Sequence, residues 1–509
     1  MILKFKTLIN NAYCVKHNER SAFCILHSAF VIVFICALLT SCAPPAAVAQ
    51  IEATAAPVSE ISATPYPTRP KYKPAELVDY IAQTGDTLPA LAGHFNTSVE
   101  EILAANPIIP ADVTTLPPGL PMKIPIYYLP LWGSQFHIFP DSAFVNGPVA
   151  LEFDTQSFVD AYPGWIKNHR DYVGGRNRNG AEIVDYVAIN FSVSPRLLLT
   201  LLEYQSGALT QLEEPDTPYP LGYVEPKKHK GMYLQLVWAA NTLNNGYYGW
   251  RGGNLTEFDL IDGSLERPDP WQNAATVGIQ YYFSRILSGS AYDRSIGPEG
   301  FLKTYRDLFG DPWADKTIHI PGSLQQPELI LPFPSGRTWT YTGAPHTGWG
   351  KGQPFAGLDF APPSSHSGCF VADPQQYSTA MANGVVARVG TGIVILDLDN
   401  DGDERTGWAI LYLHVATPGR VKEGTMLNAG DSIGYPSCEG GRTTGTHIHI
   451  ARKYNGEWIP ADSPLPFNME GWIPHNGARP YEGTLTRNGI VVIASSVSDA
   501  YSQITSKGE

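Results

Sequence analysis

The sequence predicts a multidomain α+β protein with three folded regions of different character. A chain of 509 residues is too long for a single hydrophobic core. Apolar residues recur at spacings of three and four in the middle of the chain, which predicts a mainly α-helical domain. Short β-branched runs separated by glycine and Asn or Asp follow, which predicts an antiparallel β-rich domain. Before both regions, a strand, two short helices and a closing strand predict a small βααβ module.

Composition limits the partners that this chain can have. Charged residues make up 16% of the chain and hydrophobic residues 43%, while 48 Gly and 43 Pro indicate many turns and linkers. A net charge of −13 without a basic patch argues against nucleic acid as a partner. We therefore expect no nucleic-acid binding, and we expect a monomer.

The N-terminal segment, residues 1–42, combines several basic residues, an apolar run over 29–39 and the ending Leu-Thr-Ser-Cys42. This pattern resembles a bacterial lipoprotein signal peptide. The resemblance implies export, cleavage before Cys42 and a membrane anchor through lipid on that cysteine. A retained transmembrane anchor is the alternative, although the apolar run is short for a span. Residues 43–77 are rich in Ala, Pro, Thr and Ser, which predicts a disordered linker.

Residues 78–128 carry the pattern of the βααβ module. Gly-Asp-Thr at 85–87 predicts the turn after the first strand, and Thr97 or Ser98 can cap the second helix. Glu101 stands three residues beyond Ser98, as a capping box requires.

This pattern resembles a LysM module over its whole length. LysM modules bind glycans that contain N-acetylglucosamine, so the resemblance implies peptidoglycan as a partner. The expected glycan-binding residues are Gly85, Asp86, Thr87, Asn106 and Pro107. A small structural domain without affinity for sugar is the alternative.

The helical domain is expected over residues 130–325. Its clearest helical patterns lie at 183–190, 195–204, 232–241 and 274–283. Residues 194–207 faintly resemble the lysozyme-like lytic transglycosylases, in which a catalytic Glu directly precedes a Ser. That position is Gln205 here, and an amide cannot act as a carboxylic acid, so we expect a lysozyme-like domain without catalysis. Glu203 as a displaced acid is the alternative.

The aromatic residues of the segment 245–253 in this domain leave two readings open. They could stack on sugars, or they could pack in the core.

The C-terminal domain, expected over 328–495 with a tail at 496–509, contains the run Thr-His-Ile-His-Ile at 446–450. Side chains alternate along a strand, so His447 and His449 point to the same face. Two imidazoles on one face can bind a metal, or one can bind while the other transfers protons. Two ordinary polar residues on a strand are the alternative.

Three further side chains upstream support the metal interpretation, namely His346, Asp359 and His414. Together with the His-x-His run they resemble the LytM/lysostaphin-type zinc endopeptidases, which cut bacterial cell-wall peptides. Most of that superfamily carries its first ligand in His-x-Gly-x-Asp, which here falls on Phe355. The staphylolysin and beta-lytic branch places this histidine further upstream in a loop, where His346 stands.

The resemblance implies that His346, Asp359 and His449 hold Zn²⁺, with His414 and His447 as the catalytic pair that moves protons. Three protein ligands would leave a fourth position for water, whose pKa the metal lowers. Tyr412 and Tyr481 are candidates for a hydroxyl that stabilises the oxyanion, and we favour Tyr481.

Four of the six cysteines lie within the first 42 residues, which leaves Cys369 and Cys438 for the exported part. Two thiols in an exported domain are most simply a disulfide, with metal ligation as the alternative. The segment Asp397–Asp403 has the Asp spacing of a calcium loop but carries Trp408 where an EF-hand needs Glu. An acidic hairpin turn is the favoured interpretation, and calcium is the alternative.

We therefore expect an exported, membrane-anchored zinc endopeptidase that hydrolyses peptidoglycan stem or cross-bridge peptides. Its partners would be glycan strands and cross-link peptides of peptidoglycan, and the membrane through its lipid. One alternative is a non-catalytic peptidoglycan-binding envelope protein or amidase activator with a degenerate peptidase domain. Another is a glycan-cleaving enzyme centred on Glu203.

Overall fold

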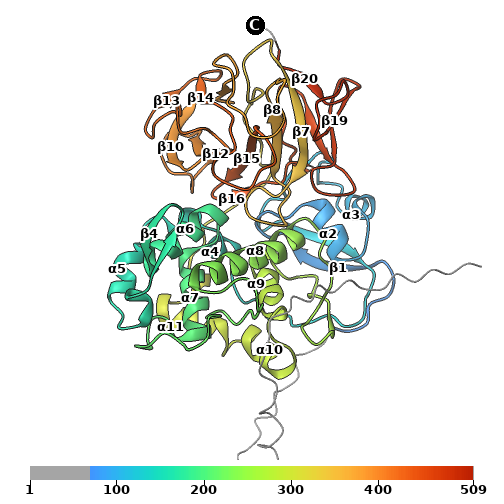
Figure 1. The fold of residues 1–509 in the computed structure, drawn as a ribbon. Coiled ribbons are helices and arrows are strands. Elements are labelled where there is room, and N and C mark those ends of the chain that lie inside the picture. The colour runs from blue at the N-terminus through green and yellow to red at the C-terminus, as the bar shows by residue number, and fades with distance from the viewer. Residues whose placement is uncertain (1–68, 463, 508–509) are drawn as a thin grey trace, which may run out of the picture. The chain divides into compact units, whose positions relative to one another are not determined.

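The computed structural model describes residues 69–462 and 464–507, and these belong to one compact unit that runs from Pro65 onward. The expected signal peptide, the lipidation site Cys42 and most of the expected linker lie outside the described residues. Within the described ranges, no helix combines the length and the apolar character that crossing a membrane requires. Figure 1 shows the elements in chain order.

The N-terminal module has the expected βααβ order. It comprises β1 (Glu76–Ile81), α2 (Leu88–His94), α3 (Val99–Ala105) and β2 (Pro121–Ile126), and the two strands pair antiparallel. The side chain of Thr87 caps α2, and Ser98 and Glu101 form the expected capping box of α3. The first strand begins two residues before the expected start of the module.

The middle region is mainly helical, as the sequence predicts. Its α-helices are α4 (Asp141–Phe144), α5 (Thr155–Asp160), α6 (Gly180–Phe191), α7 (Pro195–Ser206), α8 (Met232–Arg251), α9 (Ala274–Ser284), α10 (Gly289–Ile296) and α11 (Phe301–Phe309). Short 3₁₀ turns lie at Pro148–Ala150, Trp165–Lys167 and Pro312–Ala314, and two hairpins pair β3 (Arg170–Val173) with β4 (Arg176–Asn179) and β5 (Phe258–Asp259) with β6 (Leu265–Glu266). All four predicted helical patterns lie on helices.

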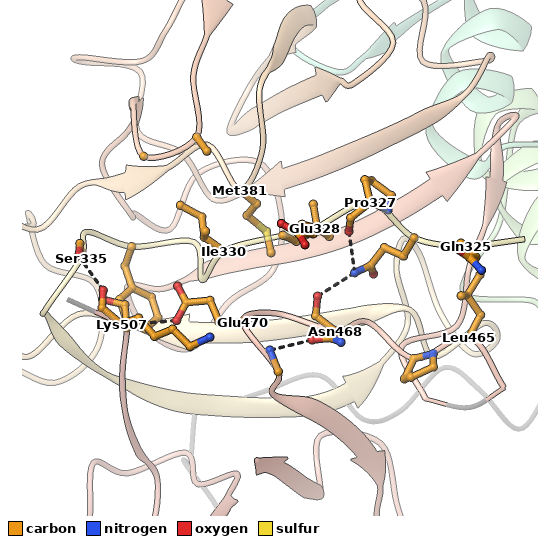
Figure 2. A pocket seen from close by; sticks show the side chains of 18 residues that line it. Gln325, Pro327, Glu328, Ile330, Ser335, Met381, Leu465, Asn468, Glu470 and Lys507 are labelled. Carbon is orange, nitrogen blue, oxygen red and sulfur yellow. Dashed lines mark hydrogen bonds between the residues drawn. The ribbon is translucent and has the colours of Figure 1, made fainter. Parts of the chain in front are cut away.

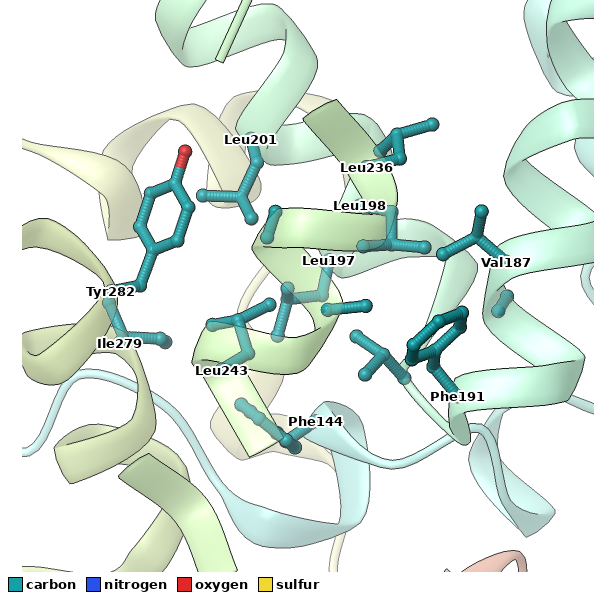
Figure 3. Close-up of a cluster of buried hydrophobic side chains, with 14 of the residues drawn as sticks. Phe144, Val187, Phe191, Leu197, Leu198, Leu201, Leu236, Leu243, Ile279 and Tyr282 are labelled. Carbon is teal, nitrogen blue, oxygen red and sulfur yellow. The ribbon is translucent and has the colours of Figure 1, made fainter. Parts of the chain in front are cut away.

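The core of this helical domain surrounds α7. Leu197, Leu198 and Leu201 are fully buried and meet side chains of the neighbouring helices, including Leu243 and Ile279 (Figure 3). The long helix α8 extends through the aromatic segment that the sequence left open. Its Tyr247, Tyr248 and Trp250 are at most 3% exposed, so they pack in the core and the sugar-stacking interpretation is wrong for them.

The C-terminal domain is built on a nine-stranded antiparallel sheet in the order β13-β10-β11-β12-β15-β8-β7-β20, with β16 paired to β15. These strands are β7 (Thr338–His346), β8 (Gly357–Ala361), β10 (Gly384–Gly390), β11 (Ile393–Asp397), β12 (Trp408–Leu413), β13 (Met426–Leu427), β15 (Ile448–Tyr454), β16 (Glu457–Trp458) and β20 (Gln503–Thr505). Smaller sheets pair β9 (Ser378–Thr379) with β14 (Ser432–Gly434) and join β17 (Ile473–Asn476), β18 (Gly483–Arg487) and β19 (Ile490–Ile493).

Within the expected C-terminal tail, residues Gln503–Thr505 form the edge strand β20. It pairs with β7, and Ile504 is buried in the domain core. One buried apolar residue in a three-residue strand is too short a pattern for sequence periodicity to reveal.

Both faces of the central strands are buried. On β11 and β12, Val394 and Ile410 belong to the core of the C-terminal domain, whereas Ile395 and Leu411 belong to the same cluster as the helical domain. Strand alternation therefore divides the sheet into a face that covers the C-terminal core and a face that packs against helices.

Buried ion pairs join the sheet to the helical domain. Glu457 on β16 accepts from Arg251 of α8 at 3.0 Å and from Tyr247 at 2.9 Å, and Arg251 also donates to Asp141. Within the C-terminal domain, Glu404 lies between Arg388 and Lys453, and Arg388 also donates to Asn190 of α6. Buried charges are tolerated when they are paired and hydrogen-bonded, and these groups are.

Candidate functional site

Three neighbouring strands bring together the side chains that the sequence predicts as metal ligands. His346 is the last residue of β7, Asp359 lies in the middle of β8 and His449 is the second residue of β15. The register places His449 opposite Asp359 and His346 opposite Gly357. The three side chains are almost fully buried, and their ligand-type atoms lie within 4.8 Å of one another.

The hydrogen bonds of both imidazoles fix which ring nitrogen faces the cluster. His346 donates from Nδ1 to the carbonyl of Ala344 at 2.9 Å, and His449 donates from Nε2 to the carbonyl of Gly348 at 3.1 Å. The inward atoms are therefore His346 Nε2, His449 Nδ1 and an Asp359 oxygen, separated by 3.0 to 3.3 Å. All three can carry lone pairs, an arrangement that suits a shared cation.

The electrostatics of the cluster agree with this geometry. Burial favours the neutral form of Asp359, but the adjoining His346 and His447 outweigh burial and hold its pKa well below the usual range. Burial also opposes a charge on His346, and the Asp359 carboxylate overcomes it and raises the pKa of that imidazole. Burial lowers the pKa of His449. The Asp359 carboxylate is thus charged, and the neighbouring His346 and His447 stabilise this charge.

The two histidines expected to move protons lie beside the cluster. Their rings are 4.6 Å apart, and His447 Nε2 is 3.7 Å from Asp359 Oδ1. His414 donates from Nδ1 to the carbonyl of Glu439, and His447 donates from Nδ1 to the carbonyl of Gly445. Burial, followed by the neighbouring His447, lowers the pKa of His414 to about 4. A neutral His414 with a free Nε2 is able to accept a proton.

His414 follows the last residue of β12 and has a φ of +68°. This left-handed conformation is uncommon for a residue with a side chain. It turns the imidazole toward His447.

Of the two tyrosine candidates, only Tyr481 lies at the site. Its ring stacks on His346 at 4.0 Å between centroids, and the residue is 52% exposed. Tyr412 is fully buried, and its hydroxyl accepts from the amide of Met381 within the core of the domain. The structure therefore excludes Tyr412 as a group that could reach a substrate.

A cavity of about 1050 Å³ opens over the histidine cluster. Apart from the histidines, Asp359 and Tyr481, its lining consists mainly of Gly, Ser, Thr and Pro, with Lys351 and Arg442 as the charged residues. Small side chains leave room for an extended peptide backbone beside the cluster.

Cys369 and Cys438 form the expected disulfide. Near it, Phe370 and Thr446 exchange hydrogen bonds in both directions, and Thr446 also bonds to Gly368. Gly368, Phe370 and Thr446 all line the cavity. The disulfide thus joins one wall of the cavity to the segment that leads into His447.

A second cavity, of about 950 Å³, lies elsewhere on the same domain (Figure 2). Lys507 is the one cationic residue in its lining. The acidic residues there include Glu470, whose carboxylate already accepts from the amides of Leu331 and Lys507. It contains no histidine, and the predicted site residues lie outside it.

Three of the residues predicted to bind glycan make contacts inside the module or with the helical domain. Asp86 accepts from Tyr80 and from the amide of Gln83, and Asn106 bonds to the backbone at both ends of its amide. A side chain at Gly85 would collide with Arg251 of the helical domain. Gly85, Asp86 and Asn106 therefore have structural roles in the module, and their assignment to glycan binding stays a prediction.

The other two residues predicted to bind glycan are Thr87 and Pro107. Thr87 caps α2, and Pro107 is exposed beside Ile108, which is 84% exposed.

Glu203 is not arranged as an acid. Its carboxylate accepts from the amides of Leu209 and Thr210 and from the Thr210 hydroxyl at 2.6 Å. These bonds engage both carboxylate oxygens of Glu203 within its own loop, and the absence of catalysis by the helical domain stays a prediction.

The acidic segment forms the turn between β11 and β12. Asp397, Asp399 and Asp401 lie within 4.8 Å of one another, but each also accepts from backbone amides of the same turn. These bonds are those of an acidic hairpin turn, and calcium binding there stays untested.

Sequence reasoning missed the backbone carbonyls that orient the rings, in particular those of Ala344, Gly348, Glu439 and Gly445. A carbonyl is present at every residue, so no residue type could have revealed which ones are used.

Two family models match parts of this chain. The N-terminal domain of LasA matches residues 137–322, and the LysM domain matches residues 80–125. Protease LasA of Pseudomonas aeruginosa strain UCBPP-PA14 is 24% identical over 339 residues, which cover 63% of this chain and 74% of LasA. The beta-lytic metalloendopeptidase of Lysobacter enzymogenes is 29% identical over 137 residues, which cover 26% of this chain and 71% of that protein.

The chain is a relative of the LytM-type metallopeptidases and carries a LysM domain.

The two ranges of this chain that match family models fall inside the expected domains 78–128 and 130–325. The helical region is thus similar to the N-terminal domain of LasA, and its likeness to lytic transglycosylases stays a prediction.

Two solved structures are similar to parts of this chain. The M23 metalloprotease pseudoalterin from the deep sea is 23% identical with a TM-score of 0.28, over 33% of this chain and 96% of pseudoalterin. The catalytic domain of lysostaphin from Staphylococcus simulans is 22% identical with a TM-score of 0.17, over 25% of this chain and 88% of that domain.

Proposed function

We propose that this protein is a zinc-dependent endopeptidase that hydrolyses peptidoglycan stem or cross-bridge peptides. The observation that carries the proposal is the convergence of three lone-pair atoms, from His346, Asp359 and His449, with both rings oriented by backbone carbonyls. The relation to LasA and to the beta-lytic metalloendopeptidase supports the same class of chemistry.

The donor set fits Zn²⁺. Two imidazole nitrogens and one carboxylate oxygen are ligands that zinc accepts, and three protein ligands are typical of its catalytic sites. Ligands about 2.0 to 2.2 Å from a tetrahedral ion lie about 3.3 to 3.6 Å apart. The inward atoms, separated by 3.0 to 3.3 Å, need to move outward by only a few tenths of an ångström, so His346, Asp359 and His449 would hold the ion.

When bound, Zn²⁺ supplies a Lewis acid that polarises a carbonyl and lowers the pKa of water. The neutral His414 would accept the proton of the attacking water, because its Nδ1 donates to the carbonyl of Glu439 and leaves Nε2 as the acceptor. Once protonated, His414 would pass this proton to the leaving amine, and His447, whose ring lies 4.6 Å from that of His414, would help to stabilise the charge that develops there. Tyr481 lines the same cavity, and its hydroxyl would donate to the developing oxyanion.

Peptidoglycan is the proposed substrate because two features favour it together. The LysM domain supports binding to the glycan strands. The cavity over the histidine cluster has walls of small side chains, which suits peptides with small residues. A glycan-bound module raises the effective concentration of the site near the cross-links of an insoluble polymer.

The proposed location is the cell envelope, with export directed by residues 1–42 and an anchor through lipid on Cys42. The LysM domain supports an association with the cell wall. The lipid anchor rests on the sequence pattern alone.

The test is digestion of purified peptidoglycan by the full chain, with release of new amino groups as the readout. We expect release that a zinc chelator abolishes and added Zn²⁺ restores. The variant His449→Ala should lose more than about 10³-fold in kcat/KM, because the metal contribution is lost with its ligand. His366→Ala is the matched control, since His366 is an exposed histidine on the wall of the same cavity.

Amine release that persists in chelator would contradict the zinc mechanism. New reducing sugar ends without new amines would favour the alternative of a glycan-cleaving enzyme. No product in the presence of Zn²⁺ would favour a non-catalytic envelope protein.

A further inference from the structure

The loop that follows His346 forms part of the site. Its residues Thr347 to Lys351 line the cavity over the histidine cluster. The carbonyl of Gly348 accepts the hydrogen bond from His449 Nε2 at 3.1 Å. The position of this loop therefore decides whether His449 presents Nδ1 to Asp359.

Helix α8 of the helical domain holds this loop through two asparagines. Asn241 Oδ1 accepts from the amide of Lys351 at 2.7 Å, and Asn245 Oδ1 accepts from the amide of Gln353 at 2.7 Å. Residues four apart lie on one face of a helix, so both oxygens point to the loop from consecutive turns. Asn241 also donates to the carbonyl of Val237, which fixes the orientation of its amide.

The fit between the loop and the helix leaves no room for side chains at two positions. A Cβ on Gly350 would collide with the Asn241 side chain, and a Cβ on Gly352 would collide with that of Asn245. Both glycines have positive φ, at +82° and +88°. The backbone thus approaches α8 closely enough for its amides to reach the asparagines.

The same face of α8 makes a further contact with the C-terminal domain. Tyr248, three residues beyond Asn245, accepts at its hydroxyl from the amide of Trp458 at 3.0 Å. Trp349 of the loop packs edge-to-face on Phe191 of α6, with 6.5 Å between ring centroids. Helix α8 is therefore fixed against the sheet next to the loop that it holds.

We propose that Asn241 and Asn245 are positioning residues of the metal site, which act through the 347–353 loop on the orientation of His449. This inference rests on the proposed metallopeptidase function. In it, the helical domain forms part of the active site, because the amides that α8 binds belong to the loop whose carbonyl orients a metal ligand.

The test compares the full-length double variant Asn241→Ala/Asn245→Ala with wild type. The first readout is hydrogen exchange at the amides of Lys351 and Gln353, which should become about 10-fold faster when the acceptors are removed. The second is Zn²⁺ affinity, measured by competition with a chromogenic chelator, which should weaken about 10-fold, as for loss of other groups that orient metal ligands.

Asn190→Ala is the matched control. Asn190 of α6 also donates to the carbonyl four residues before it, and it accepts from Arg388 of the C-terminal domain. Asn190 therefore joins the same two domains through the same type of residue. Its partner Arg388 lies on β10, which carries none of the three metal ligands. Asn245→Asp is the conservative variant, which keeps an acceptor for the amide of Gln353 and should retain its slow exchange.

The proposal is overturned if loop exchange and zinc affinity are unchanged in the double variant, or if Asn190→Ala lowers zinc affinity equally. Neither readout involves hydrolysis. A wild type that binds zinc and protects the loop but releases no amines would refute the endopeptidase proposal alone.

Discussion

This protein contains two kinds of buried carboxylate, and their charges are neutralised in different ways. Glu457 and Glu404 lie against cationic side chains that the chain supplies, Arg251 for the first and Arg388 with Lys453 for the second. In the part of the chain that the structure describes, Asp359 has only imidazoles as partners. A buried carboxylate needs a positive partner, so the first two sites are complete and the third is suited to an external cation.

The largest expected effect is a loss of folding stability when the buried pair of Glu457 and Arg251 is broken. Arg251→Met leaves Glu457 buried without its cation, which should lower the free energy of unfolding by about 3 to 5 kcal/mol. Denaturant unfolding of the full chain measures the change. Arg479→Met is the control, because the Arg479 to Glu482 pair is exposed and should change stability by less than about 1 kcal/mol. Equal effects of the two variants would contradict the comparison.

Acid should remove the same contribution more gradually. Burial opposes the charge on Glu457, but Arg251 outweighs it and lowers the pKa from 4.5 to about 2. Because the folded pKa is the lower one, the stabilisation is complete above about pH 4.5 and is lost as pH falls toward 2. A shift of this size corresponds to about 3 kcal/mol.

Unfolding free energies measured between pH 5 and pH 2 check this expectation. The variant Glu457→Gln, which has no carboxyl to titrate, should show a shallower fall with acid than wild type. Parallel curves for the two proteins would exclude the role given to Glu457.

The smallest effect concerns the incomplete site. Zn²⁺ at 100 times its Kd should stabilise the folded chain by about 2.7 kcal/mol, because it binds only the folded state. Asp359→Asn should abolish this stabilisation, whereas Asp397→Asn, in the acidic turn, should leave it intact. Thermal unfolding with and without Zn²⁺ measures the difference. A zinc effect that survives in Asp359→Asn would place the ion elsewhere.

The sequence predicted the features that depend on local pattern. The Ser98 and Glu101 capping box, the four helical patterns and the pairing of Cys369 with Cys438 are all present in the structure. The ligand-type side chains His346, Asp359 and His449 do converge. Each of these rests on a residue type that is rare in its place or on a short spacing.

The remaining features depend on contacts between distant segments, which no local pattern encodes. Gly85 fits the profile of a glycan-binding turn, yet it lies against Arg251, more than 160 residues further along the chain. Asn241 and Asn245 read as ordinary polar positions on a helix until the loop beyond His346 is seen against them. Tyr412 and Tyr481 could not be ranked by sequence, because burial alone separates them.

The left-handed backbone at His414 changes what one position of a strand can do. Ile410 and Tyr412 alternate onto the face that covers the domain core, and an unbroken strand would send residue 414 into the same apolar interior. One rotated peptide redirects the imidazole to the opposite side of the sheet, beside His447. A reactive group is thus obtained from what would otherwise be a packing position, at a conformational cost of about 1 kcal/mol or more confined to a single residue.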